Sequence, residues 1–108
     1  RKGSKHISQS YFSQVKRGAL SRNIDFDLKI NDMDQLLEKQ NFKCNLTKWE
    51  IKAGYIHSDW TASLDRIDST KGYNKENIQW LHKFVNLAKQ SFSQSEFIAM
   101  CKSIAENN

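Results

Sequence analysis

SLDRIDSTKGYNKENIQWLHKFVNLAK, residues 63–89, is the most informative stretch of this chain. Asp65 ends a β-rich run, and a loop containing Gly72 follows. A second β-rich run opens at Asn77, and a helix then carries Asn86. Although Asp65 and Asn86 lie 21 positions apart in the sequence, this order of elements can bring them close enough to hold one divalent metal ion through oxygen atoms.

The elements around this stretch follow from its periodicity. Alternating apolar and polar residues predict a strand over residues 61–67, and a second strand is expected over 78–81. A helix should then continue through Gln90. On a helical wheel this helix presents a polar, basic face and buries the opposite one. The polar face comprises His82, Lys83, Asn86, Lys89 and Gln90, and the apolar face comprises Phe84, Leu87 and Ala88.

These residues resemble the HNH endonuclease motif. NIQWLHKFVNLAK looks like its second half, usually Asn-Leu-Gln-Leu-Leu-Cys-x-x-Cys-His-x-x-Lys, and SLDRI looks like the preceding strand, usually Leu-Asp-His-Ile. The run SLDRIDSTKGYNKENIQW is similar to small HNH-type proteins common in phages, and the likeness extends loosely to RGALSRNIDF and FKCNLT. The resemblance implies an α+β fold with a ββα-metal nuclease core and flanking N-terminal and C-terminal helices.

The resemblance also implies a site and an activity. Asp65 becomes the carboxylate metal ligand, and Asn86 becomes the second ligand at a position where many family members have histidine. Asn77 is implied to brace the loop between the strands through the backbone. Two hard oxygen donors suit one Mg²⁺ or Mn²⁺ ion, with water and phosphate oxygens completing its shell. The implied function is a DNA endonuclease that nicks or cleaves phosphodiester bonds, leaving a 5′-phosphate and a 3′-hydroxyl.

Arg66 is the main departure from the family pattern, because it stands where the family has the histidine that activates water. A guanidinium stays protonated and cannot be a general base, so we expect Arg66 to clamp the scissile phosphate instead. The water could be activated by the metal or by His57, His82 or Asp68. The rival functions are a DNA-binding module of this fold that no longer cuts, and a basic domain that binds an acidic protein.

A structural zinc ion is not expected. Many relatives have two CxxC pairs, and the corresponding positions here are Cys44 with Thr47 and His82 with Val85. Only two of these four can ligate zinc, whereas a stable site needs four ligands. Apolar packing by tryptophans is the expected replacement, with base stacking as the alternative role for these rings. The tryptophans are Trp49, Trp60 and Trp80.

Positive charge is concentrated near the start of the chain. Residues 1–22 hold six of the 17 Lys and Arg residues and none of the 12 Asp and Glu residues. Such an excess favours a polyanion, with a solvated basic surface as the alternative. Together with the HNH resemblance, this excess makes duplex DNA the expected partner, bound through its phosphate backbone. The expected contacts are Lys16, Arg17, Arg22, Lys71, Lys83 and Lys89.

The 108 residues are expected to form a single domain with three parts. A basic helical part covers residues 1–41, the ββα-metal core covers 42–91, and a packing helix covers 92–108. Within the first part, a helix is predicted over residues 10–22, with Phe12, Val15 and Ala19 facing the core. Residues 24–30 suit either a short strand or an extended connection.

Capping patterns predict two further helices. Asn31 is the predicted N-cap of a helix over residues 32–40, with Asp32 and Asp34 near its positive end and with Met33, Leu36 and Leu37 facing the core. Short β pieces are expected over residues 42–60. Near the end, Ser93 and Glu96 form a capping-box pattern before a helix that should pack through Phe97, Met100, Cys101 and Ile104.

The composition bears on the compartment and on assembly. No stretch approaches the roughly 18 apolar residues of a membrane span, and Cys44 and Cys101 do not make a disulfide framework, so a cytoplasmic protein is expected. We expect Cys101 to be buried as a small hydrophobic residue. Because the first residue is Arg1 rather than Met, a fragment or a processed chain is expected. One metal centre would nick one strand, so double-strand cleavage would require two copies, for which a homodimer is one arrangement; the sequence does not decide whether the chain dimerises.

Overall fold

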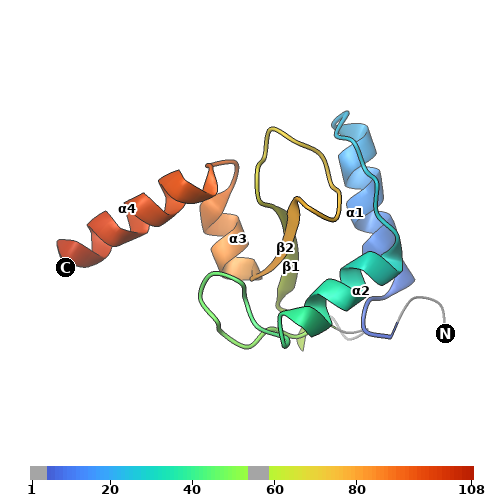
Figure 1. The fold of residues 1–108 in the computed structure, drawn as a ribbon, viewed down its shortest axis with the longest axis horizontal. Helices are drawn as coiled ribbons and strands as arrows, with labels where there is room; N and C mark the ends of the chain where they lie inside the picture. Colours follow the sequence, from blue (N-terminus) through green and yellow to red (C-terminus); the bar gives the residue numbers. More distant parts are fainter. Residues whose placement is uncertain (1–4, 54–58) are drawn as a thin grey trace.

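The computed structural model describes residues 5–53 and 59–108, which form an α+β fold. These residues contain four helices and one two-stranded antiparallel sheet (Figure 1). In chain order the elements are α1 (Gln9–Ser21), α2 (Ile30–Lys39), β1 (Ala62–Arg66), β2 (Ile78–His82), α3 (Lys83–Lys89) and α4 (Gln94–Glu106). The order β1, β2, α3 is the order that the sequence predicts for residues 61–90.

The sheet lies at the centre of the molecule. Its register pairs Leu64 with Trp80 and Asp65 with Gln79. Four of the five β2 residues are buried, because the strand is covered on both faces. Trp80 is fully buried and its indole Nε1 donates a hydrogen bond of 2.9 Å to the Met33 carbonyl of α2. The sheet is thereby joined to the N-terminal helices.

Helix α1 matches its prediction. Ser8 is its N-cap and accepts a hydrogen bond from the Tyr11 backbone N–H. Ala19 is fully buried, and Phe12 and Val15 pack against the core as expected. The Tyr11 hydroxyl accepts a hydrogen bond of 3.1 Å from the backbone N–H of Leu64, so α1 holds β1 beside Asp65.

Helix α2 begins two residues earlier than predicted. Its N-cap is Lys29 rather than Asn31, which lies inside the helix. The reason is that the Asp32 carboxylate accepts a hydrogen bond from the Lys29 backbone N–H and closes the first turn two residues further back. Met33 and Leu37 are fully buried and Leu36 packs against the core, as predicted. Asp34 is also buried.

The connection from α1 to α2 contains no named strand. Within residues 24–30, Phe26 forms one isolated parallel bridge with Tyr73 in the loop between the strands. Gly72 is required here, because an added Cβ would lie 2.6 Å from the Asp25 carbonyl oxygen. The extended alternative for this segment is therefore the one observed, and it docks the loop against the end of α1.

The described part of residues 42–60 holds one isolated antiparallel bridge, between Lys43 and Glu50, and no named strand. Two of the three tryptophans take the expected packing role. Trp80 is buried, and Trp60 packs against the core and contacts Tyr11 edge-on at 5.1 Å between ring centroids. Trp49 is 54% exposed.

Helix α3 buries a different face from the one predicted. Phe84 and Leu87 are 64% and 73% exposed, whereas Lys89 is completely buried together with Val85. The wheel failed because it assigns every lysine to solvent, and Lys89 has a buried carboxylate partner, described below. The apolar side chains of α3 are consequently left at the surface.

Helix α4 projects away from the body, and the C-terminus lies at its far end (Figure 1). The predicted capping box is confirmed, because the Ser93 hydroxyl accepts from the Glu96 N–H and the Glu96 carboxylate accepts from Ser93. The prediction that this helix packs through four residues is wrong. Phe97 is its buried hydrophobic residue, whereas Met100, Cys101 and Ile104 are exposed, so Cys101 is not a core residue.

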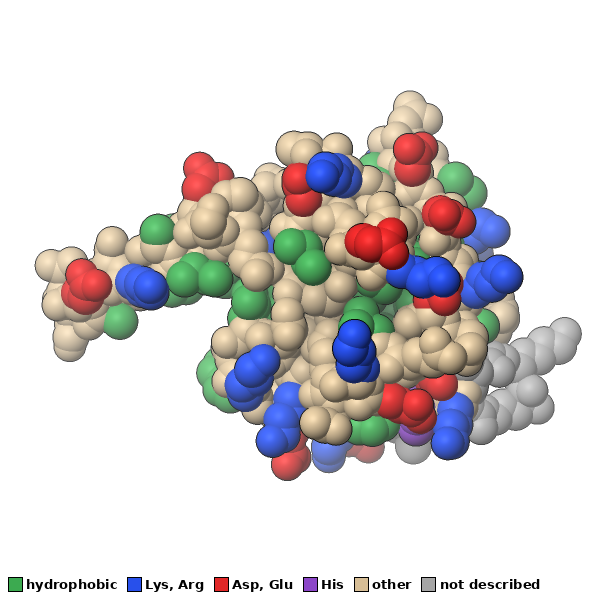
Figure 2. Space-filling model, in the orientation of Figure 1, with side chains coloured by type: hydrophobic (Ala, Val, Ile, Leu, Met, Phe, Trp, Pro, Cys, Tyr) green, Lys and Arg blue, Asp and Glu red, His purple; other side chains and the backbone are tan. Residues whose placement is uncertain are grey.

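Hydrophobic side chains appear along this projecting arm in the space-filling view (Figure 2). Part of the exposed set lines an apolar groove between α3 and α4, including Trp49, Phe84 and Ile98. None of the helices in the described ranges combines the length and the apolar character that crossing a membrane requires.

Replacing Tyr11 with phenylalanine is expected to lower the free energy of unfolding by about 1–3 kcal/mol, since the Leu64 N–H loses its acceptor. Burial raises the pKa of Tyr11 to about 12. The neutral phenol therefore stabilises the fold below its ordinary pKa of 10, and this contribution disappears as the pH rises from 10 to 12. Urea unfolding at neutral and strongly alkaline pH should show the difference between wild type and Tyr11→Phe shrinking. An equal difference at both pH values would contradict this.

Candidate functional site

Asp65 and Asn86 line one open pocket of about 530 Å³. It lies where β1, the loop that follows β1, helix α3 and the end of α1 meet. The sequence-predicted order of elements therefore brings the carboxylate and the carboxamide to a common cavity. The pocket is lined by Arg22, Ser63, Leu64, Asp65, Arg66, Ser69, Tyr73, Lys83, Asn86, Leu87, Gln90 and Ser91.

Asp65 is buried and carries an ion pair. Its Oδ2 atom lies 2.9 Å from the Lys89 ammonium and accepts a second hydrogen bond of 2.9 Å from the Gln79 amide. Lys89 also donates to the Arg66 carbonyl at 3.2 Å. Both side-chain contacts involve the same carboxylate oxygen, so Oδ1 is the oxygen left for a further ligand.

Gln79 extends this contact into a network of amides. Its amide nitrogen also donates to Gln94 Oε1 at 2.7 Å, and its oxygen accepts from Asn45 at 2.8 Å. Gln79 is buried, and a buried polar group is costly unless it is hydrogen-bonded. The network therefore fixes the position of the Asp65 carboxylate from both strands and from the start of α4.

Asn86 is oriented by the first strand. Its Nδ2 atom donates to Ser63 Oγ at 2.7 Å and lies 3.4 Å from the Leu64 carbonyl. With the amide nitrogen held by β1, the carbonyl oxygen Oδ1 is the group that remains for a ligand. The α3 residue thus offers the oxygen that the sequence pattern anticipates.

The Asn77 side chain forms hydrogen bonds with the backbone of the loop between the strands. Its amide donates to the carbonyls of Asp68 and Gly72 at 3.0 and 2.9 Å, and its oxygen accepts from the Asp68 N–H at 2.9 Å. This is the bracing contact that the family resemblance implies. Asn77 does not line the pocket, so its contribution to the site is to hold the loop.

Arg66 holds the loop that follows β1, a structural role that the sequence does not suggest. One of its terminal nitrogens, Nη1, donates to the carbonyls of Ser69 and Lys71 at 2.8 and 2.9 Å, and the guanidinium lies 5.5 Å from the centroid of the Tyr73 ring. Because these bonds use only the donors on Nη1, the remaining N–H groups of Arg66 can still serve the pocket that it lines.

The alternative general bases are not placed at the pocket. His57 lies outside the described residues. His82 caps α3, with its Nδ1 accepting from the Phe84 N–H, and its ring contacts Trp49 edge-on. Hydrogen bonds from the side chain and backbone of Thr70 lower the pKa of Asp68. Of the described candidates, neither His82 nor Asp68 lines the cavity that holds Asp65.

The six predicted DNA contacts occupy different places. Arg22 and Lys83 line the pocket, from the end of α1 and from α3. Lys16, Arg17 and Lys71 are exposed outside its lining. Lys89 is completely buried against Asp65, so the structure removes it from the set that can reach a phosphate. Its charge instead neutralises the carboxylate.

The four positions that the HNH resemblance aligns with zinc ligands are Cys44, Thr47, His82 and Val85. Cys44 and Val85 are buried, and Thr47 donates its backbone N–H to the Cys44 sulfur at 3.5 Å. Burial raises the pKa of the Cys44 thiol, but hydrogen bonds from Thr47 and nearby backbone groups lower it further, so the pKa lies below its ordinary value. The thiol thus has hydrogen-bonding partners within its own turn.

Two residues of the site, Lys89 and Gln79, escaped sequence reasoning in their observed roles. Gln79 is a polar residue inside an otherwise apolar strand, IQWL, which indicates a buried polar partner. Lys89 follows Asn86 by three positions and therefore shares its side of the helix. Only the burial of both partners distinguishes an ion pair from a solvated lysine.

Comparisons of the chain with protein-family models, with curated proteins and with solved structures found no match.

Lys89→Met should lower the free energy of unfolding by about 3–5 kcal/mol, because it leaves the Asp65 carboxylate buried without a counterion. The double variant Asp65→Asn/Lys89→Met should lose at least about 1 kcal/mol less than the sum of the single variants. Urea titrations of the four proteins measure this coupling. The exposed Lys102→Met is the control and should change stability by about 0.5 kcal/mol at most. Additive losses would show that the pair does not act as a unit.

Proposed function

We propose that this chain is a metal-dependent DNA endonuclease whose ββα-metal core consists of β1, β2 and α3. The observation that carries the proposal is the composition of one pocket. Asp65 and Asn86 line it together with the basic residues Arg22, Arg66 and Lys83. Two oxygen donors beside three cationic side chains suit a phosphodiester, whose charged oxygens need cations.

The charge balance of the pocket favours a phosphate group. Its lining contains three basic residues and one acidic residue, and that acidic residue is already paired with the buried Lys89. A nucleic-acid backbone supplies the missing negative charge and releases counterions when it binds. Gly72 lets the loop between the strands lie against Asp25, three residues after the pocket residue Arg22.

The donor set fits one Mg²⁺ or Mn²⁺ ion in part. Asp65 Oδ1 and Asn86 Oδ1 are hard oxygen ligands, and DNA phosphate and water would supply the others. The Lys89 ammonium, 2.9 Å from Asp65 Oδ2, opposes a second cation at this carboxylate. We therefore infer weak metal binding by the free protein and stronger binding when a phosphate is present. Bound there, the ion would polarise the phosphodiester and lower the pKa of a coordinated water.

The side chains of the pocket would divide the remaining work. Arg66, Arg22 and Lys83 would hold the non-bridging oxygens of the scissile phosphate and offset the negative charge that grows in the transition state. Asn86, held by Ser63, would keep its carboxamide oxygen directed at the site. Arg66 cannot remove a proton from the attacking water, so the proton must leave to another acceptor, such as solvent.

A DNA-binding module without cleavage is the second candidate. The observation that favours it is the pairing of Asp65 with both Lys89 and Gln79, which occupies one oxygen of the expected metal ligand. Both candidates use the same basic pocket for the phosphate backbone. They differ in whether a divalent ion binds at Asp65 despite its contact with Lys89.

Asp65→Asn and Asn86→Ala should each reduce metal-dependent nicking of supercoiled plasmid by at least about 100-fold, because loss of an outer-shell partner of a metal site already costs 10–100-fold. Asp65→Asn keeps the shape of the side chain but leaves the buried Lys89 ammonium without its counterion, so the folding check matters most for this variant. Gel assays with Mg²⁺, Mn²⁺ or chelator measure the rate, and circular dichroism checks folding. The matched controls Asp59→Asn and Asn31→Ala alter exposed residues and should cut normally. Salt-sensitive binding without nicking in the wild type would select the non-cleaving module.

Arg22→Ala and Lys83→Ala should each weaken DNA binding about equally for unrelated sequences and reduce the slope of log affinity against log salt by about 1. Both side chains line the pocket, and contacts to DNA phosphates do not depend on the base sequence. Fluorescence anisotropy with two unrelated duplexes over a salt series measures the slope. Lys102→Ala, on the projecting α4, is the control. Unchanged slopes in both pocket variants would place the DNA elsewhere.

A further inference from the structure

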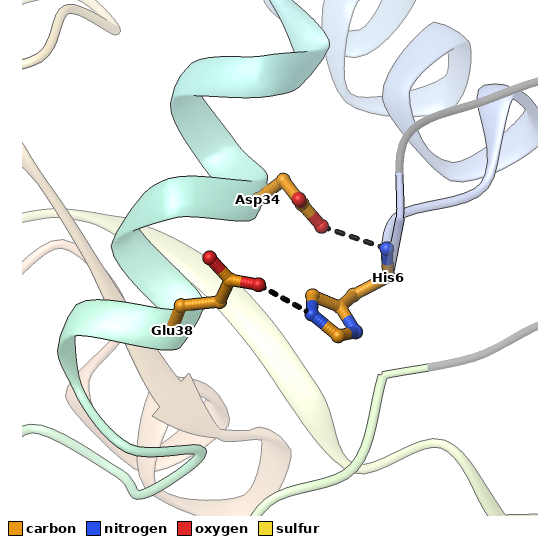
Figure 3. A group of neighbouring side chains, drawn as sticks. All are labelled: His6, Asp34 and Glu38. Carbon is orange, nitrogen blue, oxygen red and sulfur yellow. Dashed lines mark hydrogen bonds and ion pairs between the residues drawn. The ribbon is translucent and has the colours of Figure 1, made fainter.

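We propose a second metal site, for a divalent transition ion such as Zn²⁺, formed by His6, Asp34 and Glu38. The site joins the segment before α1 to helix α2 (Figure 3). None of its residues lines the pocket that contains Asp65, so it does not depend on the proposed nuclease activity. Its role would be to fasten the N-terminal segment to the body of the protein.

The spacing on α2 brings two carboxylates to one face. Asp34 and Glu38 are four residues apart, so their side chains lie one turn from each other. In Figure 3 both carboxylates are directed toward His6. The His6 backbone N–H donates to Asp34 Oδ1 at 2.7 Å, and the His6 Nε2 lies 2.8 Å from Glu38 Oε2.

The donor atoms converge to nearly the separation that a metal needs. One ligand atom from each of the three residues lies within 4.8 Å of the others. Zinc bonds of about 2.0–2.2 Å in a tetrahedral shell place ligand atoms about 3.3–3.6 Å apart. Movements of the ligand atoms by about 1 Å, through side-chain rotation, therefore suffice to complete the shell, and the backbone can stay in place.

The surroundings hold the ligands in position. The His6 ring lies edge-on against Phe42, with 4.9 Å between ring centroids and an interplanar angle of 86°. Asp34 is 4% exposed and is fixed by the His6 backbone. The Glu38 side chain is 41% exposed, which leaves a path for an ion and a place for a water ligand. Lys5 lies 3.9 Å from Glu38 but is 75% exposed and can move away.

The donor set selects the class of metal. One imidazole nitrogen and two carboxylates match the ligands of zinc and related ions, with water as the fourth ligand. Two negative charges neutralise one divalent ion, and an imidazole is a poor ligand for Mg²⁺, which prefers oxygen. Without metal, His6 Nε2 contacts Glu38 Oε2 at 2.8 Å, and zinc would take the place of this contact.

Zinc titration of the whole chain tests the proposal by calorimetry and thermal unfolding. Zinc in about 100-fold excess over its Kd should raise the Tm by at least about 4 °C, and Mg²⁺ at the same concentration should have no such effect. His6→Gln and Glu38→Gln should each weaken zinc binding at least about tenfold. Asp65→Asn and Glu106→Gln leave the three ligands intact and should retain the full zinc response.

A spectroscopic readout keeps the test decisive if a variant folds poorly. The chain contains three histidines, so the imidazole nitrogens can be resolved by NMR, and zinc should shift the His6 signals first. The proposal would be overturned if the wild type showed no response to zinc, or if both ligand variants responded as strongly as the wild type. A response lost in Asp65→Asn but kept in His6→Gln would assign the zinc to the other pocket and would also overturn it.

Discussion

The buried ion pair between Asp65 and Lys89 is the interaction on which the site depends. It joins β1 to α3 at 2.9 Å, and Gln79 adds β2 through the same carboxylate oxygen. A buried charge without its partner costs several kcal/mol, so these elements must keep their relative positions. The arrangement leaves one oxygen of Asp65 and the Asn86 carboxamide on the open side, where Arg22, Arg66 and Lys83 also lie.

This pair has opposite consequences for the two ligands of the proposed reaction. Among the described residues that line the pocket, Asp65 is the acidic one, and Lys89 neutralises it. The charges that remain there are positive, which suits the proposed phosphate ligand. The same ammonium would oppose the proposed divalent cation until phosphate oxygens also coordinate it. The cluster at His6 has the reverse character, because two carboxylates meet one imidazole there. The pocket proposed for phosphate and the cluster proposed for a transition metal are thus separate and opposite in charge.

Local patterns predicted much of the fold. The two strands, helix α1 and the Ser93 capping box were each confirmed to within one or two residues, because periodicity and capping depend on near neighbours in the chain. The buried faces of α3 and α4 were not predicted. A wheel ranks residues by polarity alone, whereas Lys89 is buried by a carboxylate 24 positions away, and Cys101 is exposed because α4 projects from the body.

The amino-acid order alone determined which elements form and placed Asp65 and Asn86 on a strand and the helix that follows the sheet. It also concentrated positive charge in residues 1–22. Only the tertiary structure decided that Lys89 neutralises Asp65, that Arg22 reaches the same pocket, and that His6 meets Asp34 and Glu38 across 28 and 32 positions. The reason is physical: helices and strands arise from hydrogen bonds and side-chain spacing along the chain, whereas charges pair according to which surfaces are buried together.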